Sequence, residues 1–106
     1  MSESIVIANS TIRQQDGLYC LNDLHRASGG KAKSQPSYFL RTQQTQDLIN
    51  KINHSANMQS AVRVINGGEN RGTYVCKQLV SAYGAWVNPD FHLLVMKLAQ
   101  KLEKAV

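Results

Sequence analysis

The sequence has little of what marks secreted, membrane or zinc-binding proteins. Its two cysteines, Cys20 and Cys76, lie far apart and form no C-x-x-C pair, which argues against a zinc ribbon and a disulfide framework. No apolar run approaches the roughly 20 residues of a membrane-spanning helix, and the N-terminus lacks the basic and apolar segments of a signal peptide. We therefore expect reduced, buried cysteines in a soluble, intracellular protein with no membrane contact.

Length and composition are those of an ordinary globular protein. The chain has 106 residues, of which 42% are hydrophobic and 18% are charged. This is enough apolar material for one core, but the chain is too short for two. No internal repeat or low-complexity linker is visible, so we expect residues 1–106 to form a single domain.

Acidic residues are scarce, and between residues 26 and 46 there are none. The chain has 12 Lys and Arg against 7 Asp and Glu, and four of these cations fall in the acid-free segment. Short or planar polar side chains lie between them, and these can donate hydrogen bonds to phosphates and base edges. Such chemistry suits nucleic acid. The cations are Arg26, Lys31, Lys33 and Arg41, with Arg63 and Arg71 in a smaller basic segment at 63–77.

The first 30 residues predict small β-elements followed by a short helix. Ile5–Ile7 is a β-branched run, and Asp16-Gly17 lies between two short strand-like pieces, which indicates a hairpin. Asn22 is a typical N-cap for the helix, and Asp23 would favour its positive end. Gly29 and Gly30 would end it.

Two further short helices are expected next. Pro36 fits the first turn of the first of them, and Thr42 or Thr45 can cap the amphipathic helix that follows. Short helices joined by a small turn predict helix-turn-helix geometry.

The second half returns to alternating hydrophobicity and then to helix. Residues 61–65 and 73–75 read as strands joined by a glycine-rich turn at 67–72, which predicts a second hairpin. A helix should follow Cys76 with Trp86 on its packed side. Asn88 and Pro89 then begin another, with Leu94 on its apolar face.

Several segments, in this order, resemble the KilA-N domain, which occurs mainly in bacteriophages, prophages and large DNA viruses and is related to the fungal APSES domain. The resemblance implies an α+β fold: a winged-helix-like helix-turn-helix core, β-hairpins of which one can act as a wing, and two C-terminal packing helices. It also implies binding of double-stranded DNA in phage or prophage gene regulation, in the cytoplasm of a bacterial or phage-infected cell. The segments are Asp16–Tyr19, the helix from Asn22, Tyr38–Arg41, Gly72–Val75 and Ala85–Phe91.

The resemblance implies that the second helix of the motif, Pro36–Arg41 with its approach Lys31–Gln35, faces DNA. Where many family members have tryptophan in this helix, the chain has Phe39, which we interpret as a core anchor. Lysines before a helix can bind phosphates, and glutamine and serine can read base edges. The candidate DNA contacts are Lys31, Lys33, Ser34, Gln35, Ser37, Tyr38, Arg41, Gln44, Arg63 and Arg71.

These candidates have structural alternatives. Arg41 could pair with Asp47 inside the protein instead of reaching DNA. The two lysines could be ordinary solvated charges, and the arginine-flanked loop could be a plain exposed hairpin.

Catalysis is not expected. His25 lies two residues from Asp23, a spacing that does not place both on one helix face, and no nucleophile is paired with a base. The histidines and cysteines show no metal-ligand spacing. We expect a binding protein with no enzyme activity, cofactor or metal.

Two other functions stay open. The helices from Trp86 to Leu102 could serve a protein-interaction module of the antirepressor type, with a homodimer or another protein as its partner. Binding to single strands or RNA would need an exposed aromatic platform, for which Tyr38 alone is thin support. Because KilA-N domains often precede a second domain, the chain could be the N-terminal part of a longer protein.

Overall fold

The fold is α+β, with a five-stranded antiparallel sheet covered by helices. The structure is a computed structural model and describes residues 4–7, 10–54 and 61–104. The strands are β1 (Ser4–Ile7), β2 (Ser10–Gln15), β3 (Leu18–Cys20), β4 (Val62–Ile65) and β5 (Gly72–Val75). The helices are α1 (Leu21–Ala27), the 3-10 turn η1 (Ala32–Ser34), α2 (Pro36–Arg41), α3 (Gln43–Asn53), α4 (Lys77–Val87) and α5 (Pro89–Lys104).

The sheet joins strands from two separate parts of the sequence, residues 4–20 and 62–75. Its order is β1-β2-β3-β5-β4, so the central contact pairs β3 with β5 in the register Tyr19 with Val75 and Cys20 with Tyr74. Both predicted hairpins are confirmed, β2 with β3 and β4 with β5. Asp16 and Gly17 have φ of +51° and +82°, the positive values that a two-residue type I′ turn requires.

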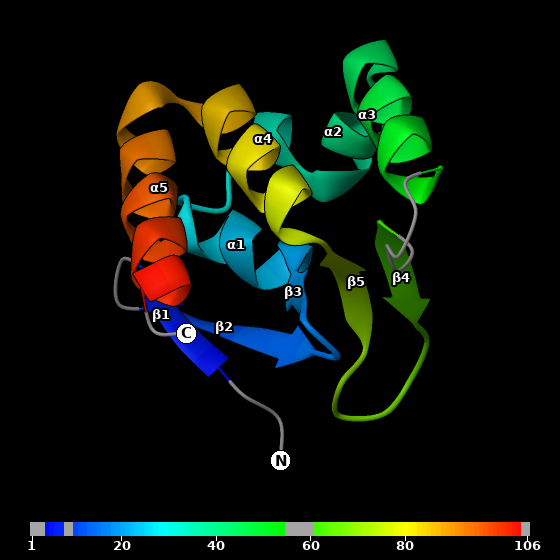
Figure 1. The fold of residues 1–106 in the computed structure, drawn as a ribbon. Helices are drawn as coiled ribbons and strands as arrows, with labels where there is room; N and C mark the ends of the chain where they lie inside the picture. Colours follow the sequence, from blue (N-terminus) through cyan, green and yellow to red (C-terminus); the bar gives the residue numbers. More distant parts are fainter. Residues whose placement is uncertain (1–3, 8–9, 55–60, 105–106) are drawn as a thin grey trace.

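The helices gather on one side of the sheet (Figure 1). Helix α5 packs along α4 and also contacts β1, while α3 contacts α4 at the other end of the molecule. Helix α1 contacts β2, β5 and α2. It therefore links the sheet to the short helices that carry most of the predicted DNA contacts.

The predicted helix boundaries are largely confirmed. Pro36 begins α2, and the Thr42 hydroxyl oxygen accepts a hydrogen bond from the Thr45 backbone N–H at 3.2 Å, which caps α3. The Asn88 side chain accepts from the Phe91 backbone N–H at 2.8 Å at the start of α5. The N-cap expected at Asn22 is wrong. Helix α1 begins at Leu21 because the chain turns directly out of β3.

The core is apolar and aromatic, and both cysteines belong to it. Cys20 and Cys76 are buried and free, as predicted. Phe39 is 2% exposed and its ring centroid lies 5.2 Å from that of Tyr83, so it is the core anchor that the sequence indicated. Two expected core positions are less covered: Trp86 is 37% exposed at the edge of this cluster and Leu94 is 42% exposed.

Tyr83 ties the core to the loop that precedes α2. It is fully buried on α4, and its hydroxyl donates a hydrogen bond to the Ser34 carbonyl oxygen at 2.6 Å. Burial raises the pKa of Tyr83 to about 12, so the hydroxyl keeps its proton and remains a donor across the physiological range. This bond fixes the 3-10 turn against α4.

We expect Tyr83→Phe to lower the free energy of unfolding by about 1–2 kcal/mol, because it leaves the Ser34 carbonyl without its donor. Urea denaturation followed by circular dichroism measures the change. Tyr38→Phe is the matched control, since Tyr38 is 46% exposed. Equal losses in the two variants would contradict a structural role for the Tyr83 hydroxyl.

Candidate nucleic-acid interface

The loop between α1 and α2 has a defined conformation that leaves its lysines exposed. It leaves α1 through Gly29 and Gly30, whose φ of +114° and +67° favour glycine. The His25 ring Nε2 lies 2.7 Å from the Lys31 carbonyl oxygen and so ties the loop back to α1. Lys31 and Lys33 are both exposed. Neither ammonium group makes an ion pair with a carboxylate in the described part of the chain.

Ser34 is buried, unlike the lysines predicted to contact DNA beside it. Only 5% of the residue is exposed, and its carbonyl oxygen accepts the hydrogen bond from the Tyr83 hydroxyl. The sequence did not indicate this burial, because serine's small polar side chain gave no sign that the 3-10 turn would dock on α4. Ser34 is instead an anchor for the exposed lysines beside it.

Helix α2 has one buried and one exposed side. Phe39 points into the core, whereas Ser37, Tyr38 and Arg41 are exposed. Gln35 is half-buried at the N-cap position, where its carbonyl accepts the Tyr38 backbone N–H at 3.0 Å. Three of the predicted contacts on this helix thus lie together on its solvent side.

Arg41 does not pair with Asp47. The Asp47 carboxylate accepts a hydrogen bond from the Gln43 side chain at 2.9 Å. The Arg41 guanidinium carbon lies 5.9 Å from the centroid of the Tyr38 ring, in cation–π range. With no ion pair to another described residue, the Arg41 charge is open to a ligand.

Gln44 has more apolar surroundings than the other predicted contacts. It is exposed on the first turn of α3 and lines a pocket of about 350 Å³ together with Leu48 and Trp86. Its amide is accessible, but its neighbours there are largely apolar.

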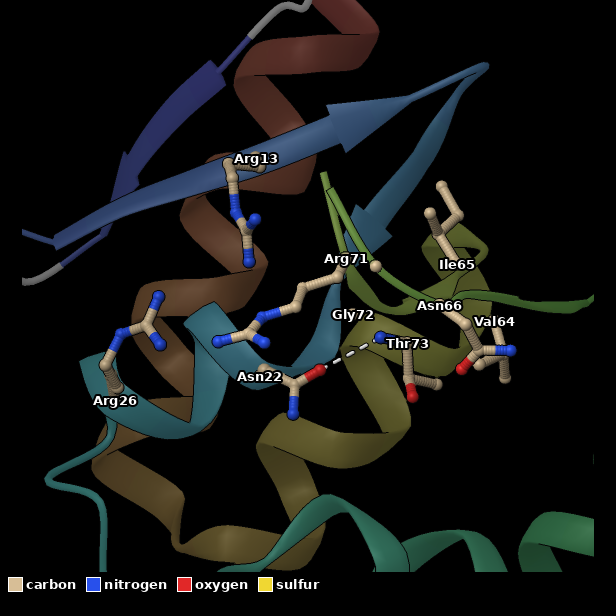
Figure 2. A pocket seen from close by; sticks show the side chains of 10 residues that line it. Arg13, Asn22, Arg26, Val64, Ile65, Asn66, Arg71, Gly72 and Thr73 are labelled. Carbon is tan, nitrogen blue, oxygen red and sulfur yellow. Dashed lines mark hydrogen bonds between the residues drawn. The ribbon is translucent and has the colours of Figure 1, made fainter. Parts of the chain in front are cut away.

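The two arginines of the second hairpin differ. Arg63 on β4 forms an ion pair with Asp16 in the β2–β3 turn at 2.5 Å, so its charge is offset. Arg71, in the loop before β5, is exposed and has no hydrogen bond or ion pair with any other described residue. Figure 2 shows its guanidinium extending toward Arg13 and Arg26. The structure therefore groups Arg71 with α1 and β2.

Arg13, Arg26 and Arg71 line a pocket of about 520 Å³ between α1 and the β4–β5 hairpin (Figure 2). The two walls are joined where the Thr73 backbone N–H donates to the Asn22 side-chain oxygen at 2.9 Å. The lining residues are Arg13, Asn22, Arg26, Val64, Ile65, Asn66, Gly67, Arg71, Gly72 and Thr73.

A buried carboxylate organises this region. Asp23 is 1% exposed and accepts hydrogen bonds from the Arg13 backbone N–H and Nε, both at 2.9 Å, and from the Arg26 guanidinium. Burial alone would raise the pKa of Asp23, but the bonds from Arg13 outweigh burial and hold that pKa below its usual value.

Sequence reasoning placed Asp23 at the positive end of a helix and missed this cluster. The i, i+3 spacing to Arg26 was visible, but the pairing of Arg13 with a residue ten positions later depends on the packing of α1 against β2.

In the described part of the chain, no group of three or more His, Cys, Asp or Glu could hold a metal ion. No helix there is both long and apolar enough to cross a bilayer.

The chain belongs to the KilA-N family, since the family model described as "KilA-N domain" matches residues 4–105. It is also similar to a protein named "Protein kilA" from Escherichia phage P1, with 38% identity over 79 residues. That match covers 74% of this chain but only 29% of the phage protein. No solved structure matches the chain.

We expect Asp23→Asn to lower the free energy of unfolding at neutral pH by about 2–4 kcal/mol, because it leaves two guanidinium groups without their buried anion. Asp47→Asn, which changes an exposed carboxylate, should stay within about 0.5 kcal/mol of the original protein. Urea denaturation of both variants makes the comparison.

The difference should also depend on pH. Because the folded-state pKa of Asp23 is lowered, its stabilising contribution is complete above the pKa of an unfolded aspartate, about 3.9, and is lost as pH falls through the lower folded value. The stability gap between Asp23→Asn and the original protein should therefore narrow in acid. A gap independent of pH would contradict a charged Asp23.

Proposed function

We propose that this domain binds duplex DNA through the basic surface formed by Lys31, Lys33, Ser37, Tyr38 and Arg41. The observation that carries the proposal is that the three cations of this surface are exposed and have no acidic partner among the described residues. Exposed cations without a partner can neutralise DNA phosphates, and this binding is favourable because it releases the counterions condensed on the DNA.

The proposed mechanism has two parts. Lys31 and Lys33 dock on backbone phosphates, and α2 acts as the second helix of a helix-turn-helix that enters the major groove. Ser37 and Tyr38 are then placed to reach base edges, with half-buried Gln35 at the helix start. The β4–β5 hairpin serves as the wing. Gln44 could contact DNA only from the start of α3.

Membership of the KilA-N family supports this proposal, because KilA-N domains of phages generally bind DNA. The similarity to Protein kilA of a bacteriophage agrees with a role in phage or prophage gene regulation. The proposal is for binding and not for catalysis. The match covers only 29% of the length of that phage protein, so the proposal concerns this domain and not the activity of a whole protein.

The Lys33→Ala/Arg41→Ala double variant tests the docking surface. Fluorescence anisotropy with a labelled random-sequence duplex should show affinity falling by about tenfold or more at low salt, because two phosphate contacts are lost. The log–log salt slope should decrease in magnitude by about two from an expected value of about −4 to −5.

Lys97→Ala is the matched control, because Lys97 is an exposed cation on α5, a helix that contributes no residue to this surface. It should bind almost as the original protein does. Absence of binding by the original protein even at low salt would contradict the proposed function. So would a double variant that binds as Lys97→Ala does.

A protein-interaction module is the second candidate, and the exposed apolar side chains of α5 favour it. Leu93 is 58%, Leu94 42% and Met96 41% exposed. If this face joins two copies of the chain, sedimentation velocity should show a dimer that Leu93→Glu/Met96→Glu converts to a monomer. A monomer at every concentration would contradict self-association through α5.

A further inference from the structure

The pocket between α1 and the β4–β5 hairpin carries more positive charge than its own residues neutralise. Three arginines line it, and two of them, Arg13 and Arg26, pair with the carboxylate of buried Asp23. The excess of two positive charges is gathered in one concave place, where charges of one sign reinforce each other. An anion is the ligand that this balance favours.

The three arginines are not equally free to bind it. Arg13 uses its guanidinium on Asp23, the Cys20 sulfur at 3.3 Å and the Glu69 carbonyl at 3.0 Å, so it is a fixed part of the wall. The Arg26 side chain is 65% exposed and uses one of its nitrogens on Asp23. A guanidinium has five N–H donors, so Arg26 keeps others for a ligand.

Arg71 is the most available of the three. It is exposed, and its guanidinium has no partner among the described residues. It reaches across from the hairpin, while Arg26 comes from α1 (Figure 2). Two planar forks on opposite walls can bind the oxygens of one phosphate, which arginine recognises by paired hydrogen bonds.

Neutral groups complete the wall. Because the Asn22 side-chain oxygen is held by the Thr73 backbone N–H, the amide of Asn22 is fixed in orientation and its NH₂ group remains a donor. Gly72, with φ of +150°, lets the hairpin approach this closely. A Cβ there would lie 3.2 Å from the Cys20 sulfur and 3.3 Å from the Asn22 oxygen.

The lining also says which anion fits. None of the ten lining residues is aromatic, so the pocket offers no ring on which a nucleobase could stack. Its volume of about 520 Å³ exceeds what one phosphate needs and leaves room for the sugars on either side. A phosphodiester segment suits these walls better than a base does.

We infer that this pocket seats a backbone phosphate of the bound duplex, held between Arg26 and Arg71 with Asn22 as a further donor. The inference rests on the proposed DNA binding and extends it to a pocket that brings Arg26, the first cation of the acid-free segment, together with Arg71 of the second hairpin. The contact of His25 with the Lys31 carbonyl places the lysine loop next to the Arg26 end of α1. One stretch of DNA backbone can therefore meet both surfaces.

Arg71→Gln and Arg71→Lys test the seat. Arg71 has no partner among the described residues, so both variants should fold normally, which circular dichroism checks. In duplex anisotropy titrations, Arg71→Gln should lower affinity several-fold and reduce the magnitude of the salt slope by about one. Arg71→Lys should restore the slope but not the full affinity, because an ammonium group cannot form the paired hydrogen bonds.

Lys97→Gln is the control that also removes one positive charge. If the original protein binds DNA and Arg71→Gln matches Lys97→Gln, the phosphate seat is contradicted while the proposed function stands. If Arg71→Lys matches the original protein, Arg71 acts as diffuse charge and the seat is again contradicted. If the original protein does not bind at all, the proposed function itself fails.

Free inorganic phosphate is the other source of the same group. Thermal unfolding of the DNA-free protein in phosphate, against chloride at the same ionic strength, distinguishes the two sources. Stabilisation by phosphate that Arg71→Gln abolishes, together with unchanged DNA binding by that variant, would assign the pocket to a free anion and overturn the inference. No phosphate-specific stabilisation, with DNA affinity reduced in Arg71→Gln, is the expected result.

Discussion

A single buried carboxylate holds together the region where the sheet, the first helix and the second hairpin meet. Asp23 on α1 is bound by the backbone and guanidinium of Arg13 on β2 and by Arg26 at the end of its own helix. Arg13 then reaches the Glu69 carbonyl in the hairpin loop. Leaving a buried charge unpaired is costly, so the carboxylate restricts how these three elements can pack. It also holds the side chains of Arg13 and Arg26, two of the three arginines that line the pocket.

The acidic side chains also determine which cations remain available to a ligand, because each carboxylate that pairs with a cation offsets its charge. Asp23 is saturated by two arginines, Asp16 offsets Arg63, and Asp47 is engaged by the Gln43 side chain. Of the two hairpin arginines predicted to contact DNA, only Arg71 keeps an open charge. Among the described residues, Lys31 and Lys33 on the α1–α2 loop, Arg41 on α2 and Arg71 beside the pocket have no carboxylate partner, and Lys97 on α5 is another such cation. The proposed DNA-binding face is the part of the described surface where several such cations lie on neighbouring elements.

Local signals predicted much of this fold, because the chemistry that forms each feature is itself local. The Asp16-Gly17 turn, Pro36 at the start of α2 and the caps at Thr42 and Asn88 are set by neighbours within three residues. The features that the sequence did not indicate depend on tertiary contacts. Ser34 is buried by a tyrosine 49 positions away, and Asn22 bonds to Thr73 across 51 positions. The pocket likewise joins three separate parts of the chain, so no pattern in a single segment could indicate it.

Nuclear magnetic resonance of the ¹⁵N-labelled protein, titrated with a short duplex, tests the proposed interface most directly. If DNA binds to the proposed face, amide chemical shifts should change in the α1–α2 loop, in α2 and around Arg26 and Arg71. The exposed residues of α5, including Leu93 and Met96, should change little. Shift changes confined to α5, or none at a low salt concentration, would contradict it.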